Sequence, residues 1–141
     1  MTDVVQSIGD FLISQALWPL TGGVWHMPLA MIGTALVMRF MFRLHSAYAV
    51  LLSVCANLFS CIAFAAVIQL LLYAHFLDGS VHISCAMGTV SASISYALIQ
   101  TFFQILLFWM LSRVQHVSVR RLSLAALIGN LLAALLIIRH S

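Results

Sequence analysis

Long apolar runs separated by short polar or basic links make up most of this chain. Four such runs cover residues 28–43, 47–77, 83–112 and 122–138, and charged side chains occur in them only at Arg39 and Arg43. A helix rises ~1.5 Å per residue, and about 20 apolar residues cross the hydrocarbon core of a bilayer. The pattern therefore predicts four transmembrane helices over these ranges, the second being longer than one crossing requires.

The first 20 residues alternate differently, with apolar side chains three and four positions apart and polar side chains between them. The apolar set is Val4, Val5, Ile8, Phe11, Leu12 and Ala16, and the polar set is Asp3, Gln6, Ser7, Asp10 and Ser14. This spacing is typical of an amphipathic helix. We expect residues 1–20 to form an interfacial helix ahead of the four spans, in an all-α integral membrane protein with one membrane domain over residues 1–141.

Composition supports the membrane environment, because 64% of residues are hydrophobic and 6% are charged. Soluble domains are roughly 45–50% apolar and about 25% charged, so a water-soluble fold is excluded. The acids are Asp3, Asp10 and Asp78, all outside the apolar runs, which removes the paired carboxylates of glycosidase or diiron sites. A net charge of +3 is too small for an extended nucleic-acid surface, and no nucleic-acid partner is expected.

The arginines indicate the orientation. Five of the six lie in or beside two links on one predicted side, namely Arg39, Arg43, Arg113, Arg120 and Arg121, and Arg139 lies on the other. Basic links stay cytoplasmic, so both links are expected in the cytoplasm and both termini outside. The protein is expected in a bacterial inner membrane, where these arginines also contact anionic lipid head groups.

The third predicted span carries a polar stripe. Thr89, Ser93, Tyr96, Gln100 and Gln104 follow one another at intervals of three or four residues and share one helical face. Ser53, Asn57 and Ser60 form a similar row on the second span, and Asn130 lies among small residues on the fourth. Because an amide without a partner is costly in hydrocarbon, these side chains are expected to face protein or water. They serve either helix packing or a path for a small polar solute.

Histidines lie near the predicted span ends, and a metal or haem role is an alternative to simple interfacial placement. The candidates are His26, His45, His75, His82 and His116. Imidazole binds haem iron, and imidazole together with sulfur ligands suits copper. No cofactor is required by the sequence, because no spacing among these residues specifies a metal site.

Function is less determined than environment. The chain has no nucleophile, zinc, phosphate-loop or dinucleotide motif, which favours a non-enzymatic role. The leading hypothesis is an accessory, assembly or anchoring subunit that joins other membrane subunits, or further copies of itself, by helix packing. The alternatives are a homo-oligomeric transporter or channel for a small polar solute, and a membrane redox protein with haem or copper held by histidine.

Overall fold

The computed structural model describes residues 25–73 and 89–140, together with residues 4, 8, 9, 11, 12 and 15 near the N-terminus. Four long helices follow one another in these ranges: α2 (His26–Phe40), α3 (Ser46–Tyr73), α4 (Thr89–Ser112) and α5 (Val119–His140). The predicted all-α class is confirmed. The six described N-terminal residues are helical, and the rest of the predicted 1–20 helix lies outside the described residues.

The helix bounds follow the apolar runs with some differences. Helix α2 begins two residues before the predicted run and ends at Phe40, because the chain turns through residues 41–45. Arg43 has a φ of 56° in this turn, a conformation that side chains with a Cβ adopt infrequently. Helix α5 extends beyond the predicted 122–138 at both ends. Residues 74–77 and 83–88 of the second and third predicted spans lie outside the described residues.

Three helices are long and apolar enough to cross a bilayer, as expected of a multi-pass integral membrane protein. They are α3, α4 and α5, with 28, 24 and 22 residues. Helix α2 is apolar but has 15 residues, and at ~1.5 Å per residue it is shorter than the ~30 Å hydrocarbon core. The described chain therefore contains three candidate spans and one shorter apolar helix.

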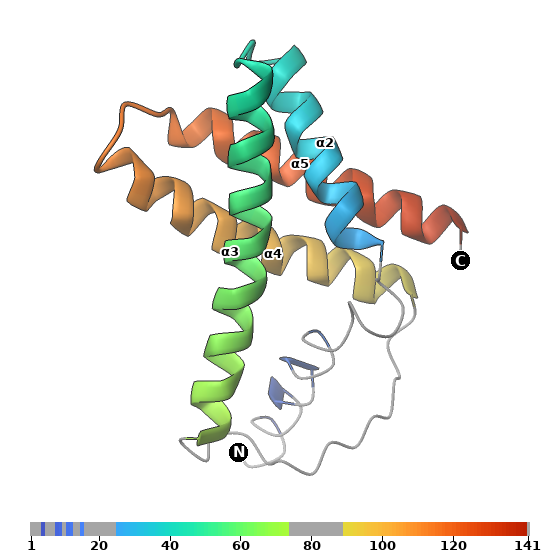
Figure 1. Cartoon of the computed structure of the whole chain (residues 1–141). Coiled ribbons are helices and arrows are strands. Elements are labelled where there is room, and N and C mark those ends of the chain that lie inside the picture. Colours follow the sequence, from blue (N-terminus) through green and yellow to red (C-terminus); the bar gives the residue numbers. More distant parts are fainter. Residues whose placement is uncertain are drawn as a thin grey trace.

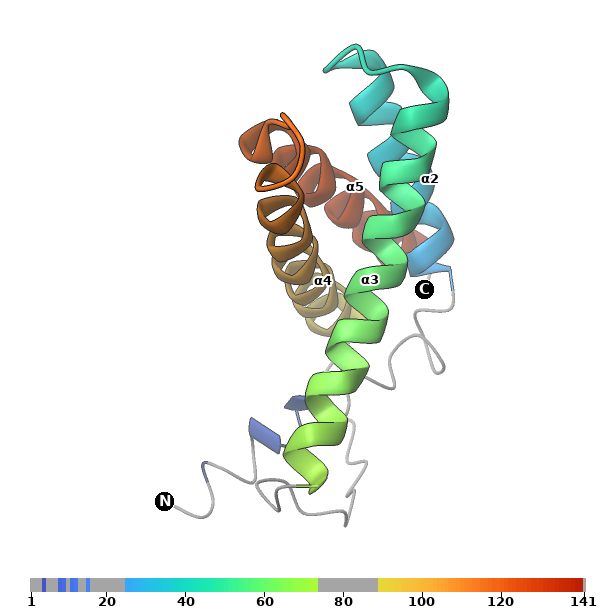
Figure 2. The ribbon, with the colours of Figure 1, turned by 60° about the vertical axis from the view of Figure 1, so that its left-hand side comes forward.

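The helices form two hairpins that cross. In Figure 1 the α2–α3 hairpin runs up the view and the α4–α5 hairpin runs across it. Helix α5 makes the most extensive contacts, packing against α2 and α4, while α3 packs against the same two helices. Figure 2 shows the α2–α3 link and the α4–α5 link at the same end of the molecule.

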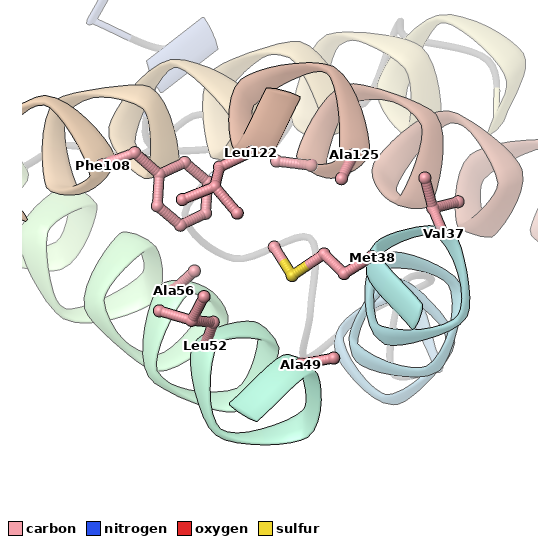
Figure 3. Packing of buried hydrophobic residues seen from close by; sticks show 9 residues of the cluster. Val37, Met38, Ala49, Leu52, Ala56, Phe108, Leu122 and Ala125 are labelled. Atoms are coloured by element: carbon pink, nitrogen blue, oxygen red, sulfur yellow. The ribbon is translucent and has the colours of Figure 1, made fainter. Parts of the chain in front are cut away.

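An apolar cluster fills the end of the bundle near these two links (Figure 3). Its large members are Met38, Phe108, Leu52 and Leu122, and small alanines separate them on the facing helices. Alanine lets helix backbones approach, and the large side chains fill the remaining space. The cluster holds all four helices together and positions both links.

Helices α2 and α5 meet most closely at two glycines. A Cβ built on Gly33 would lie 3.3 Å from the Gly129 Cα atom. A Cβ built on Gly129 would lie 2.7 Å from the Thr34 backbone nitrogen and 2.9 Å from its Cα atom. Because neither glycine has a side chain, the two backbones come into direct contact here.

Candidate functional site

Polar side chains from all four helices are buried inside the bundle. Fully or almost fully buried are His26 and Thr34 on α2, Ser53, Asn57 and Ser60 on α3, Ser93, Tyr96, Gln100, Thr101 and Gln104 on α4, and Asn130 on α5. In an apolar environment such groups are stable only when they bond to one another or to water. We call this set the interior polar network.

Asn130 is the centre of the network. Its Nδ2 group donates to Thr101 Oγ1 at 3.1 Å, to Gln104 Oε1 at 3.1 Å and to the Ala126 carbonyl at 2.9 Å. Thr101 in turn donates to the Ala97 carbonyl at 2.8 Å. The residues beside Asn130 are small: Gly129 faces Gly33 and Thr34 of α2, and Ala126 is fully buried.

Gln104 connects this centre to α3. While its Oε1 accepts from Asn130, its Nε2 donates to Asn57 Oδ1 at 3.2 Å and lies 3.4 Å from Ser60 Oγ. Asn57 and Ser60 use their own donors on α3 carbonyls, at 2.8 Å each. Both ends of the Gln104 amide are therefore occupied, and α3, α4 and α5 are joined by one chain of hydrogen bonds.

His26, the first residue of α2, connects this remaining helix to the network. Its Nε2 lies 3.2 Å from Asn130 Oδ1, an oxygen that can only accept. The bond therefore requires a proton on Nε2, which leaves Nδ1 as an acceptor in the neutral ring. Among the described residues Nδ1 has no partner. The ring also packs edge-on against Tyr96, with centroids 4.8 Å apart.

The N-terminal part of the stripe on α4, from Ser93 to Gln100, makes fewer hydrogen bonds. Gln100 Oε1 lies 3.7 Å from Cys61 Sγ, which is also 3.8 Å from the Tyr96 hydroxyl. Gln100 Nε2 and Ser93 Oγ are buried without a partner among the described residues, as is Thr34 Oγ1 on α2. The network is thus tightly bonded around Asn130 and Gln104 and loosely bonded around Gln100.

The structure brings most of the predicted packing residues together, but Ser53 bonds to α2 and not to the stripe on α4. Ser53 donates to the Met31 carbonyl at 2.6 Å and so joins α3 to α2, whereas Asn57 and Ser60 meet α4 through Gln104. Thr89 begins α4, but its side chain lies outside the described residues. The stripe from Ser93 to Gln104 faces the interior of this chain.

The histidines occupy separate places. His26 belongs to the interior polar network, while His45 and His116 are exposed in the two links, and His75 and His82 lie outside the described residues. His45 Nδ1 accepts from the Ala47 backbone N–H at 3.3 Å. Within residues 25–73 and 89–140, no group of three metal-ligating His, Cys, Asp or Glu side chains gathers.

The arginines predicted to set the topology lie at the end where the two links meet. Arg39, Arg43, Arg113, Arg120 and Arg121 are all exposed there. Arg39 donates to Ser46 Oγ at 2.8 Å, and the Arg113 guanidinium lies 4.7 Å from the centroid of the Trp109 ring. The three acids of the chain, Asp3, Asp10 and Asp78, are outside the described residues, so no described carboxylate neutralises these charges.

The outward helix faces differ from one another. Exposed positions on α4 and α5 within the apolar spans are mostly large, such as Leu98, Phe102, Leu132 and Leu135. Helix α3 also exposes large side chains, but one of its faces combines Leu51, Leu58 and Ile62 with the smaller Cys55, Ala65 and Ala66 and with Gln69. We call this set the outer face of α3. It combines small side chains with an amide that makes no side-chain hydrogen bond to another described residue.

No model of a known protein family matches this chain, and no curated protein or solved structure matches it either. The functional argument therefore rests on the residues and their geometry.

Two residues of the network were not singled out from the sequence. Thr101 lies beside the stripe rather than on it, and its place three residues before Gln104 was the available signal. Thr34 is a polar residue after Gly33 in an apolar run, a pattern that indicates close helix approach. The pairing of His26 with Asn130 joins residues 104 positions apart, and no local spacing indicates it.

Proposed function

We propose that this protein is an accessory or assembly subunit of a larger membrane complex, which it joins by packing one helix face against a partner helix. The observation that carries the proposal is the outer face of α3. Small residues let helices approach in lipid, and side-chain amides form interhelical hydrogen bonds there. An exposed face with Cys55, Ala65, Ala66 and Gln69 suits a partner helix better than the large side chains exposed on α4 and α5.

The interior polar network supports this choice over a solute path. The amides of Asn130, Gln104 and Asn57 are used by one another, and they join helices of the same chain. A polar path needs groups that are open to water or to a solute. Gln104 of the stripe on α4 is therefore engaged within the subunit itself, and the contact with a partner is assigned to α3.

The proposal includes the topology. Helices α3, α4 and α5 cross the membrane, and α2, packed against α5 at Gly33, makes a fourth and shorter crossing. Both basic links then face the cytoplasm of a bacterial inner membrane, and both termini face outside. The close approach of the two links at one end agrees with this arrangement.

Site-specific photocrosslinking in native membranes tests the docking face. A benzophenone amino acid at Ile62, which is 69% exposed on α3, is expected to form an adduct with an unrelated membrane protein. The matched control is the same probe at Leu132, which is 45% exposed on α5 and is expected to label lipid. Lipid adducts alone at both positions would contradict the proposal, and an adduct containing only a second copy of this chain would favour a homo-oligomer instead.

Substitution of the same face provides the second measurement. Ala66→Trp adds bulk where a partner helix is expected to approach, so recovery of the crosslinked partner should fall severalfold. Leu132→Trp adds bulk on α5 and should leave recovery unchanged. Equal losses in both variants would place the effect on folding or insertion and would count against a specific face.

A further inference from the structure

The α2–α3 link and the α4–α5 link, which are the turns of the two hairpins, border a partly open cavity of about 270 Å³. Its wall comes from residues far apart in the sequence, with Phe42, Leu44 and Tyr48 on the α2–α3 side and His116, Val117, Ser118, Arg121 and Leu122 on the α4–α5 side. We call it the link cavity. Its volume is about nine times the roughly 30 Å³ that a water molecule occupies in the liquid, so it accommodates a chemical group rather than a single water.

The wall of the link cavity has two chemistries. Phe42, Leu44, Val117 and Leu122 form an apolar part. Leu122 belongs to the apolar cluster, and the other three pack against it. Tyr48, His116, Ser118 and Arg121 supply hydroxyl, imidazole and guanidinium groups. A ligand that fits this wall has a polar end that accepts hydrogen bonds and an apolar end.

The charge around the cavity indicates the sign of that polar end. Arg121 lines the cavity, and Arg43 and Arg120 are exposed in the same two links. None of these three guanidinium groups makes a hydrogen bond to the side chain of another described residue, whereas Arg39 and Arg113 are already engaged by Ser46 and Trp109. Arginine binds phosphate with parallel N–H bonds, so an anion is favoured.

Position in the membrane identifies the source of the anion. The links adjoin α3, α4 and α5, which are long and apolar enough to span a bilayer, and Trp109 and the 72% exposed Phe40 lie near the link ends of α4 and α2. This is the level of lipid head groups, where an aromatic belt and arginine side chains are commonly found. A phospholipid at this level presents a phosphate together with its first acyl carbons.

We propose that the link cavity is a binding site for an anionic phospholipid, with Arg121, Ser118 and Tyr48 at its phosphate and the apolar wall against the start of an acyl chain. Occupancy of the site joins the α2–α3 link to the α4–α5 link. The site shares no residue with the outer face of α3.

Native mass spectrometry of the full chain in mild detergent tests the site by lipid titration. The probes are dioleoyl phosphatidylglycerol, dioleoyl phosphatidylcholine with the same acyl chains, and inorganic phosphate. We expect the phosphatidylglycerol complex to form at least fivefold more tightly than the phosphatidylcholine complex, and inorganic phosphate at equal concentration to leave it intact. Equal binding of the two lipids would overturn the proposal, and displacement by inorganic phosphate would assign the site to free phosphate.

Variants that each remove one arginine charge distinguish a specific lipid site from general electrostatic attraction of the lipid. Arg121→Gln is expected to weaken phosphatidylglycerol binding about tenfold, because it removes a charged donor that lines the cavity. Arg120→Gln removes the same charge one residue away but outside the cavity wall, and Arg139→Gln removes it at the other end of α5, so both should cost less than about threefold. Equal losses for Arg120→Gln and Arg121→Gln would overturn the proposal.

A variant that keeps all charges gives an independent result. Val117→Trp fills the cavity from its apolar side and is expected to lower phosphatidylglycerol binding about tenfold while the thermal midpoint of the lipid-free protein stays within a few degrees. Unchanged lipid binding in Val117→Trp would overturn the proposal. If Arg121→Gln fails to fold, Val117→Trp and the comparison of the three probes still decide it.

Discussion

The contact between Gly33 and Gly129 makes a sharp prediction, because the two glycines face each other with unequal room. Gly129→Ala places a methyl group against Thr34 Oγ1, 2.7 Å from the Thr34 backbone nitrogen and 2.9 Å from its Cα atom. Real Cβ atoms do not approach backbone atoms so closely, and a backbone cannot rotate away as a side chain can. Helix α2 must therefore move away from α5.

Three effects set the size of the change in stability. Overpacking of a close contact typically costs about 1–3 kcal/mol, and replacing a helical glycine by alanine recovers about 1 kcal/mol of helix propensity. The displacement also stretches the neighbouring bond between His26 and Asn130, which adds about 0.6 kcal/mol in a membrane protein. We expect Gly129→Ala to lower the free energy of unfolding by about 1–2 kcal/mol.

Gly33→Ala is the matched control on the opposite helix. Its added methyl would meet Gly129 at 3.3 Å from Cα and 3.4 Å from the carbonyl oxygen, a tight contact that a shift of a few tenths of an ångström relieves. The gain in helix propensity is the same, so Gly33→Ala should stay within about 0.5 kcal/mol of the parent protein.

The measurement is unfolding by sodium dodecyl sulfate in mixed micelles, followed by tryptophan fluorescence. The double variant Thr34→Ala/Gly129→Ala should recover only part of the loss, since it removes the Thr34 hydroxyl but keeps the backbone atoms in the way. A Gly129→Ala protein that is as stable as Gly33→Ala would refute the close approach of the two helices.

Three further predictions concern the network and the links. Asn130→Leu breaks three interhelical hydrogen bonds and should lower the free energy of unfolding by about 2 kcal/mol in the same assay, at ~0.6 kcal/mol each. Gln100→Met removes a buried donor without a partner among the described residues, so its effect on stability should be neutral or favourable. Equal losses in the two variants would contradict the network. Ser53→Ala removes the bond from α3 to the α2 backbone and should cost about 0.6–1 kcal/mol, and a loss of zero would remove that contact. His45→Cys and His116→Cys should react with a membrane-impermeant maleimide from the same side of the membrane, and labelling from opposite sides would disprove the shared position of the links.

The sequence alone was sufficient for the helical class and for most helix positions. Apolar runs without charge have few stable forms in lipid, because every backbone N–H and C=O must be bonded within the segment. The spacing of Ser93, Tyr96, Gln100 and Gln104 also placed them on one face, since that spacing is local and follows from 3.6 residues per turn. The first predicted span was too long, because the turn at residues 41–45 is not marked by glycine or proline.

Only the tertiary structure decided which polar groups meet. Asn130 is bonded to His26 on α2 and to Gln104 on α4, at separations of 104 and 26 residues, and no periodic pattern links such positions. Those pairings depend on how the two hairpins cross, which is set by the glycine contact between α2 and α5 and by the cluster around Met38 and Phe108. The same crossing brings the two basic links together into one cavity. Sequence periodicity fixes the face of a helix, but the neighbour of that face depends on the packing of the whole bundle.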